Sequence, residues 1–417
     1  MTHSRRTFLR QAAGLLGVLA SSCSPGALSG RGSTATREIT IGATFSRTGD
    51  YAAISHDLEQ GFRLWAEEVN VTGGLLGRPV KLALADDQSD GDAARDAYRQ
   101  ILPQADVVLT PYGSYLTGAV LPLIEAARVP GLAPAAADRS LWTAGRQWTV
   151  QMLNPADSFL EGAVTLARAR GARRVATLYR PSPFVDMVMA GARAAARRAG
   201  MTVTAVRRYQ KLADIETEMR AISASDIDLL LGGGFEPGAA GGGFLPDAVA
   251  LARALRRARM QVPMVTWLVG SSFPGFGEAL GAEVEGMTGN TAWKPLLKTP
   301  GNPAFITAYR RRWGAAPDAH AAQGYAAGQV IGEAIRRAGS LSPTAVRDAL
   351  FRLEMRTVFG RFQVSASGLQ IGKVNAILQW QEGDRQVVWP PWLRTAHLRY
   401  RVTEASFRGS IQSNIIR

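Results

Sequence analysis

The sequence contains few residues that could form disulfides or bind metals. Its 417 residues include one cysteine, Cys23, so an internal disulfide and a four-cysteine zinc site are both excluded. The four histidines stand at positions 3, 56, 320 and 397, without the helical spacing of a metal-binding pair. We therefore expect no metal site, and the pattern argues against a metalloenzyme.

Acidic residues are outnumbered by basic ones. The 48 basic and 34 acidic residues give a formal net charge of +14, and only five of the basic residues are lysine, which leaves 43 arginines. Such an excess would suit nucleic acid or an anionic membrane as a partner. The arginines, however, fall mostly on the polar faces of predicted helices, as at 193–198 and 253–259, without a nucleic-acid-reading motif. We predict a solvated arginine-rich surface and no nucleic-acid partner.

Long hydrophobic runs are also missing. No segment has 18 consecutive apolar residues, so no membrane-spanning helix is expected. The N-terminus instead carries Arg5-Arg6 and a short apolar stretch over 12–20, which is the pattern of a twin-arginine secretion signal over residues 1–22.

Small residues precede Cys23, and this arrangement resembles the lipobox of bacterial lipoproteins. We expect the Cys23 thiol to be lipidated, so that it anchors the mature protein. The alternative is an incidental cysteine in an ordinary soluble periplasmic precursor. Residues 23–37 are rich in glycine, serine and threonine and are expected to form a flexible tether.

From Glu38 onward, short strands alternate with amphipathic helices. Alternating apolar residues predict a strand over 39–45, and apolar residues at helical spacing over 58–69 predict a helix that ends at Gly73-Gly74. Further strands are predicted at 79–85, 107–109 and 131–135, and further helices at 92–102 and 116–127. Such a series predicts a parallel sheet covered by helices on both faces.

A second series of the same kind begins after Asn154. Its strands are predicted at 174–179, 202–207, 228–231 and 264–267, with helices between them and later helices at 305–313 and 320–337. The segments 375–381 and 385–388 flank a turn, Glu382-Gly383-Asp384, and are typical of a β-hairpin. The chain ends in a basic tail over 393–417, which we expect to be loosely packed.

Motifs for catalysis or cofactor binding fail in their details. The glycine-rich run at 232–238 follows a strand, but Pro237 occupies the third glycine position of a dinucleotide fingerprint. Residues 368–373 lack the spacing of a phosphate-binding loop, and Ser271-Ser272 do not lie in a nucleophile elbow. We predict that the protein is not an enzyme and uses no cofactor.

Several short motifs occur in a consistent order between Arg37 and Pro390. They are the segments 41–51, 68–70 with 73–78, 86–90, 324–328, 378–381 and 387–390. Together they resemble the leucine/isoleucine/valine-binding family, the type I periplasmic binding proteins that serve ABC importers.

The resemblance implies an α/β fold of two doubly wound parallel-sheet lobes joined by three crossovers. A small ligand would be trapped between the lobes at the carboxyl ends of the strands by hinge closure. Lobe 1 would comprise 38–150 and 291–357, and lobe 2 would comprise 151–290 and 358–392. The crossovers are expected near 150–153, 288–291 and 357–361.

The resemblance also implies ligand-binding residues in lobe 1. The loop Tyr112-Gly113-Ser114-Tyr115 matches the family loop whose serine binds a ligand carboxylate, and helix-start N–H groups suit an anion. The alternative is that Ser114 only caps the helix that follows. The next family loop has a threonine where this chain has only alanines. The candidates from these loops and from two aromatic positions are Tyr51, Gly113, Ser114, Tyr115, Ala135, Ala136, Ala137 and His320.

The remaining candidates are Phe184, Phe235, Leu268 and Trp293. Phe184 and Phe235 match aromatic positions of the family, Leu268 stands where an acid pairs a ligand ammonium, and Trp293 is expected near the mouth. The alternative for each aromatic is a place in the core.

The missing threonine and acid affect the ligand that the site can hold. A buried ammonium without a partner is costly, so a zwitterionic amino acid is poorly served unless Glu236 or Asp138 substitutes for the acid. We therefore predict a small carboxylate or amide with an apolar or aromatic body.

The function implied is the extracytoplasmic substrate-binding component of an ABC importer of the branched-chain amino acid type. The partners would be this small ligand and the permease subunits in the inner membrane. The chain would be monomeric and located in the periplasm or lipid-anchored on the outer face of the cytoplasmic membrane. The alternative is a ligand-sensing receptor module that reports to a membrane regulator, and the neighbouring genes would distinguish the two.

Overall fold

The computed structural model describes residues 37–400, except 144, 224–225, 237 and 240–242. The predicted signal, Cys23, the tether up to residue 36 and residues 401–417 of the predicted tail lie outside the described residues. The chain divides into a unit that ends at Arg37 and a second unit that begins at Glu38. Within the described part of the chain, no helix is long and apolar enough to cross a membrane.

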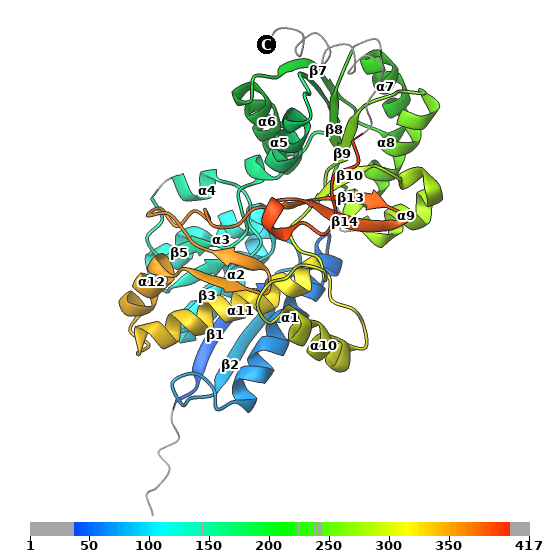
Figure 1. Ribbon diagram of the computed structural model, residues 1–417. Coiled ribbons are helices and arrows are strands. Elements are labelled where there is room, and N and C mark those ends of the chain that lie inside the picture. Colours follow the sequence, from blue (N-terminus) through cyan, green and yellow to red (C-terminus); the bar gives the residue numbers. More distant parts are fainter. Residues whose placement is uncertain (1–36, 144, 224–225, 237, 240–242, 401–417) are drawn as a thin grey trace, which may run out of the picture. The chain divides into compact units, whose positions relative to one another are not determined.

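The first lobe is built on a five-stranded parallel sheet in the order β2-β1-β3-β4-β5 (Figure 1). Its strands are β1 (Ile39–Phe45), β2 (Val80–Asp86), β3 (Val107–Leu109), β4 (Gly131–Ala133) and β5 (Thr149–Gln151). Successive strand residues face opposite sides of the sheet. Val107 accordingly belongs to one core cluster and Val108 to another, so both faces of the sheet are covered.

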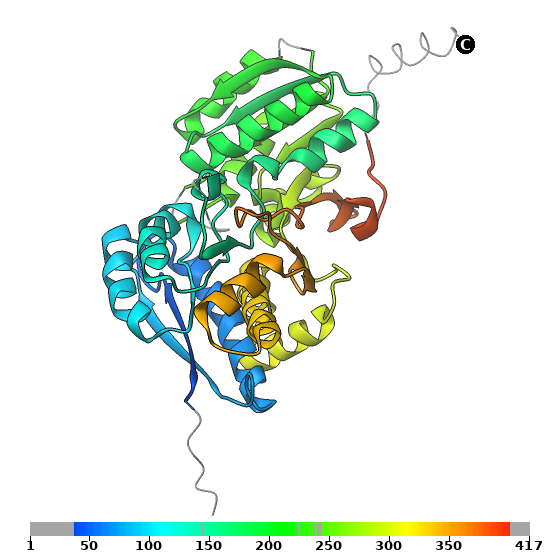
Figure 2. The ribbon, with the colours of Figure 1, turned by 90° about the vertical axis from the view of Figure 1, so that its left-hand side faces the viewer.

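In the part of the chain that the structure describes, seven α-helices belong to this lobe. They are α1 (Ala52–Val71), α2 (Gly91–Ile101), α3 (Gly113–Ala127), α4 (Ser140–Thr143), α10 (Asn302–Trp313), α11 (Ala319–Ala338) and α12 (Pro343–Arg352). Buried residues of α2 and α3 pack on Val108, whereas those of α1, α10, α11 and α12 share the cluster that contains Val107. Both views place the late helices α10–α12, in yellow and orange, beside the blue elements of the first sheet (Figures 1 and 2).

The second lobe is built on a seven-stranded sheet in the order β14-β13-β10-β9-β8-β6-β7. Its strands are β6 (Arg174–Tyr179), β7 (Thr202–Arg208), β8 (Leu229–Gly233), β9 (Met264–Trp267), β10 (Thr288–Thr291), β13 (Ala376–Gln381) and β14 (Asp384–Trp389). The helices are α5 (Glu161–Ala169), α6 (Pro183–Arg198), α7 (Ile215–Ser223), α8 (Leu245–Arg257) and α9 (Pro274–Leu280). Leu178 and Tyr179 fall in different core clusters, so this sheet too is covered on both faces.

The predicted fold class of two parallel-sheet α/β lobes is therefore right. The predicted hairpin forms as β13 and β14, and it extends the second sheet because β13 pairs antiparallel with β10.

The third crossover differs from its predicted position. It was placed at 357–361, but β11 (Met355–Thr357) and β12 (Gly360–Phe362) pair there as a small antiparallel hairpin. Val358, Phe359 and Phe362 are buried in the core of the first lobe. The chain joins the second sheet only at β13, so the change of lobe falls between Val364 and Ala376. The hairpin returns the chain to the first lobe before it leaves.

Helices α1 and α11 approach each other unusually closely. A Cβ atom added at Gly61 of α1 would lie 1.9 Å from the carbonyl oxygen of Ala321, and one added at Gly324 of α11 would lie 1.9 Å from that of Leu58. Two glycines on facing helices therefore allow backbone-to-backbone contact, which fixes α11 and the residues at its start.

The first part of the predicted tail is ordered rather than loosely packed. The Arg399 N–H donates to Gln379 Oε1 at 2.8 Å, and Gln379 Nε2 donates back to the Arg399 carbonyl at 2.8 Å. Leu398 is buried in the core of the second lobe. The expectation of loose packing is thus wrong for these residues, because β13 offers them a buried glutamine side chain as a hydrogen-bonding partner.

Candidate ligand-binding site

Ser114 connects two loops at the carboxyl ends of β3 and β4. Its Oγ accepts hydrogen bonds from the backbone N–H groups of Ala137 and Asp138, both at 3.0 Å. A serine hydroxyl has one donor besides its acceptor sites, so Ser114 keeps its own O–H to donate. The predicted serine therefore lies at the sheet edge where open α/β sheets bind ligands.

The alternative role for Ser114, as a helix cap, is wrong. Helix α3 begins at Gly113, and its N-cap is Tyr112, which makes no side-chain cap hydrogen bond. Gly113 has φ +81°, in the left-handed region that favours glycine. Among the described residues, no side chain caps the first-turn N–H groups of α3, which suits an anionic group beside Ser114.

Tyr51, Tyr112 and His320 form a continuous aromatic group next to this helix start. The ring centroids of Tyr51 and Tyr112 are 5.6 Å apart, and those of Tyr112 and His320 are 5.7 Å apart. The structure thus brings together two predicted site residues and Tyr112, which was not among the predicted contacts. Tyr115, by contrast, is 63% exposed.

His320 is held by a carboxylate that the prediction omitted. Asp318 caps α11 by accepting from the N–H groups of His320 and Ala321, and its Oδ2 lies 3.0 Å from His320 Nδ1. Burial lowers the pKa of His320, but the Asp318 carboxylate more than offsets this, so the pKa lies above its usual value. An Asp just before an apolar helical run is a helix-start signal that could have identified this residue.

Asp57 on α1 is the carboxylic acid near His320 whose surroundings disfavour its ionised form. Burial and the nearby Asp318 carboxylate raise the pKa of Asp57 to about 6. In the unfolded chain the carboxyl ionises near its ordinary pKa of about 4. Asp57 therefore contributes stability that is complete below pH 4 and is lost as the pH rises through 6.

Replacement of Asp57 by asparagine is accordingly expected to stabilise the protein at alkaline pH. After allowance for its partial exposure, the gain in the free energy of unfolding should be about 1–2 kcal/mol at pH 8 and near zero at pH 4. Urea unfolding at both pH values measures it, with the exposed Asp96→Asn as the control. An equal gain at both pH values would contradict the assigned cause.

In the second lobe the predicted aromatics belong to a phenylalanine cluster. Phe184 packs edge-on against Phe159 and Phe244, at centroid distances of 5.5 and 5.9 Å, and Phe235 lies 5.0 Å from Phe244. Phe184 and Phe235 are half-buried and follow β6 and β8. They place an apolar surface at the carboxyl ends of these strands.

The two acids considered as substitutes for the missing ammonium partner are both engaged. Glu236 forms an ion pair with Arg180 at 3.4 Å. Asp138 Oδ1 accepts from the Ser140 N–H at 2.8 Å. Leu268 itself is fully buried in the core of the second lobe. Among the described residues of these loops, no carboxylate without a partner is therefore available to pair with a ligand ammonium group.

Other predicted residues are also buried. Trp293 is 3% exposed, and its Nε1–H donates to Asn302 Oδ1 at 3.1 Å. Ala135, Ala136 and Ala137 are all buried. Contact of these residues and of Leu268 with a ligand stays a prediction, and for the alanines it would have to involve backbone atoms.

A charged cluster at the end of β6 was not identified from the sequence. Arg180 Nε donates to Asp247 Oδ1 at 2.9 Å, and the Tyr209 hydroxyl donates to the same oxygen. Asp247 is fully buried, and a Cβ atom at Gly234 would lie 2.1 Å from Asp247 Oδ1. Burial and the Asp247 carboxylate raise the pKa of Tyr209, which keeps its hydroxyl protonated as a donor. The cluster fixes the loop that carries Phe235.

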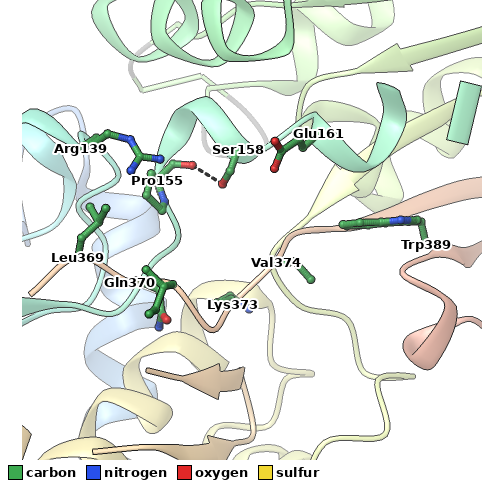
Figure 3. A pocket seen from close by; sticks show the side chains of 10 residues that line it. Arg139, Pro155, Ser158, Glu161, Leu369, Gln370, Lys373, Val374 and Trp389 are labelled. Atoms are coloured by element: carbon green, nitrogen blue, oxygen red, sulfur yellow. Dashed lines mark hydrogen bonds between the residues drawn. The ribbon is translucent and has the colours of Figure 1, made fainter. Parts of the chain in front are cut away.

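A cavity of about 230 Å³ lies elsewhere, along the segments that connect the lobes (Figure 3). Its lining residues are Arg139, Pro155, Ser158, Glu161, Leu369, Gln370, Ile371, Lys373, Val374 and Trp389. None of the predicted ligand-binding residues lines this cavity. We therefore place the candidate site at the strand ends, where the hydroxyl, helix start and aromatic groups gather.

Among the described residues no group of three or more His, Cys, Asp or Glu side chains could hold a metal ion.

Two parallel-sheet lobes joined by three crossovers, with polar and aromatic groups at the strand ends, define a two-lobe ligand-binding protein. More specifically, the chain belongs to the periplasmic binding protein family, whose family model matches residues 38–385. This is a family of substrate-binding proteins, and it implies a location outside the cytoplasm.

The chain is similar to Leu/Ile/Val-binding protein homolog 7 of Brucella melitensis, with 22% identity over 88% of this chain and 94% of the relative. Its fold is similar to that of a branched-chain amino acid transporter substrate-binding protein from Streptococcus pneumoniae in complex with isoleucine. The TM-score is 0.70 at 18% identity, covering 85% of this chain and all of the other. It is also similar to a solute-binding protein of an ABC transporter from R. palustris in complex with benzoate, with a TM-score of 0.67, 16% identity and coverage of 88% and 100%.

Proposed function

We propose that this chain is the substrate-binding component of an ABC importer of the branched-chain amino acid type. It binds a small carboxylate- or amide-bearing ligand between its lobes, closes over it and presents it to permease subunits in the inner membrane. The chain acts as a monomer and carries out no catalysis.

The observation that carries this proposal is the arrangement at the start of α3. Ser114 bridges two loops through its lone pairs and keeps its O–H to donate, and the N-cap residue of α3 supplies no acceptor for the first-turn N–H groups. A carboxylate or amide oxygen placed there would accept from the hydroxyl and from backbone N–H groups. Tyr51, Tyr112 and His320 beside it suit an apolar or aromatic body.

The engaged acids near the strand ends support a ligand without an ammonium group. Leu268 replaces the family's acid, and both Glu236 and Asp138 already have partners. A buried ammonium would therefore lack a counter-charge at that position, which is costly. An acid without an ammonium group, such as the benzoate in the R. palustris complex, meets this requirement better than isoleucine does.

Calorimetric titration of the purified protein tests the ligand class. The panel contains leucine, valine, benzoate and aliphatic acids of matched size. Binding of an acid with no binding of leucine is the expected result. Submicromolar leucine binding would overturn the ligand class while leaving the substrate-binding role intact.

Replacement of Ser114 by alanine is expected to weaken binding of whichever acid is found. Loss of a hydrogen bond to a charged group costs about 1.5–3 kcal/mol, or roughly a 10- to 150-fold rise in Kd. Ser140→Ala is the matched control, because Ser140 is exposed and begins α4 two residues after Asp138, whose N–H donates to Ser114. An unchanged Kd in Ser114→Ala, measured by the same titration, would remove this residue from the site.

Export and anchoring are further parts of the proposal. Arg5-Arg6 and the short apolar stretch that follows support the twin-arginine route, and the small residues before Cys23 support a lipid anchor on the outer face of the cytoplasmic membrane. Fractionation of cells into periplasmic, membrane and cytoplasmic fractions tests export and anchoring, and retention of an Arg5→Lys, Arg6→Lys variant in the cytoplasmic fraction would support the twin-arginine route.

A further inference from the structure

Lysine is rare in this chain, and the two buried lysines lie in the segments that connect the lobes. The five lysines are at positions 81, 211, 294, 298 and 373, against 43 arginines. Lys294 is 7% exposed and Lys373 is 8% exposed, whereas Lys298, four residues after Lys294, is exposed. Lys294 follows β10 in the second crossover, and Lys373 lies in the third crossover before β13. Lysine is thus buried at two of the three places where the chain changes lobe.

The side chain of Lys373 joins these two crossovers. Its Nζ donates to the carbonyl oxygen of Ala292 at 2.8 Å and to that of Phe359 at 2.6 Å. It also lies 3.8 Å from the centroid of the Phe359 ring. A Cβ atom at Gly360 would lie 3.3 Å from Nζ, so the glycine leaves room for the amine. One nitrogen atom therefore holds the backbone of two segments, and its own segment is the third that it connects.

The third crossover is joined to the first by a glutamine pair. The Gln370 N–H donates to Gln151 Oε1 at 3.2 Å, and Gln370 Nε2 donates to the Met152 carbonyl at 3.0 Å. With Lys373, this segment is hydrogen-bonded to both other crossovers. It also lines the cavity beside the hinge (Figure 3).

Lys294 makes a similar connection on the other side of the second crossover. Its Nζ donates to the Arg385 carbonyl and lies 3.5 Å from Asp384 Oδ1, both on the hairpin of β13 and β14. The second crossover is thus attached to the hairpin by one lysine and to the third crossover by the other.

We propose that Lys373 is the positioning residue of the hinge, which couples the second and third crossovers and so limits how far the lobes can separate. The motion of a two-lobe protein must be absorbed by the few residues of its crossovers. Segments that share a hydrogen-bonded nitrogen cannot change their backbone angles independently. The inference goes beyond the proposed function, because it concerns the separation of the lobes without any ligand.

The choice of lysine follows from its shape and chemistry. Carbonyl oxygens from different directions fit the compact, rotatable donors of an amine better than the flat fork of a guanidinium. Among the described residues, no carboxylate lies within ion-pair distance of Lys373 Nζ. Burial lowers the pKa of Lys373 to about 7, and an amine can lose its proton under conditions where arginine cannot.

Electron-spin distance measurement on the full chain tests the proposal. Cys23→Ser removes the native thiol, and spin labels are attached at Thr307→Cys on α10 of the first lobe and Glu278→Cys on α9 of the second. Lys373→Met is compared with Lys373→Arg and with Lys298→Met, the exposed lysine of the same region. All measurements are made without ligand, so a failed proposal about the ligand does not affect them.

Lys373→Met is expected to raise the population of an alternative label separation about tenfold, as expected for loss of one to two net hydrogen bonds. Lys373→Arg should not restore the original distribution, and Lys298→Met should leave it unchanged. Thermal unfolding identifies the variants that are folded. A folded Lys373→Met with the parental distance distribution would overturn the proposal, even if its unfolding temperature is lower. If Lys373→Met does not fold, Lys373→Gln, which keeps a donor, takes its place under the same criterion.

Discussion

Replacement of Asp247 by alanine is expected to lower the free energy of unfolding by about 3–5 kcal/mol. Asp247 is fully buried, and its Oδ1 accepts from Arg180 Nε and from the Tyr209 hydroxyl. Removal of the carboxylate leaves a largely buried guanidinium without its main counter-charge and a buried hydroxyl without its acceptor. Urea or thermal unfolding measures the effect.

An exposed ion pair provides the control for Asp247. Asp96 and Arg99 pair on the surface of α2, where Asp96→Ala should cost about 1 kcal/mol or less. Asp247→Asn should cost less than Asp247→Ala, because an amide oxygen still accepts from Tyr209. If Asp247→Ala and Asp96→Ala lowered the free energy of unfolding equally, the importance of burial for the Asp247 ion pair would be contradicted. A change in ligand affinity is also expected for Asp247→Ala, since this cluster fixes the loop of Phe235.

The second large effect is expected for Gly324→Ala on α11. The added methyl group would lie 1.9 Å from the Leu58 carbonyl oxygen, so α1 and α11 must move apart. Overpacking of this kind costs about 1–3 kcal/mol, which thermal or urea unfolding measures. His320 lies one turn earlier on the same helix, so the displacement should also weaken ligand binding.

Gly118→Ala in α3 is the matched glycine control. Its added Cβ would meet only Leu141 Cδ2 at 3.4 Å, an ordinary contact. Because glycine is a poor helix former, this change should be neutral or should stabilise the protein by up to about 1 kcal/mol. Should Gly324→Ala behave like Gly118→Ala, the close approach of α1 and α11 would be refuted.

The local elements could be predicted from the sequence wherever apolar residues repeat at a clear period. The strand predicted at 264–267 is β9, and the helix predicted at 305–313 lies within α10. The start of α3 was placed at 116 rather than Gly113, because Gly113, Ser114 and Tyr115 show no apolar period. The strand predicted to reach 135 ends at Ala133, before Pro134, which cannot donate a ladder hydrogen bond.

The candidate site could be predicted only in part. The family resemblance predicted Ser114, Phe184 and Phe235 as site residues, and all three lie in or next to loops that follow parallel strands, at the sheet edge where such folds bind ligands. Periodicity does not show whether a loop residue faces outward. Leu268 and Trp293 are buried, while Tyr112 and Asp318 lie beside His320.

The alternation of predicted strands and helices by itself determined that this is an α/β protein of two sheets, and the single cysteine excluded an internal disulfide. These are properties of composition and of local periodicity, which the chain carries in any conformation. The tertiary structure alone decided that α1 and α11 meet through two glycines, that Asp247 holds Arg180 and that the rare lysines 294 and 373 lie at the crossovers. Each of these contacts joins residues far apart in the sequence, and such pairs leave no periodic signal in a single chain.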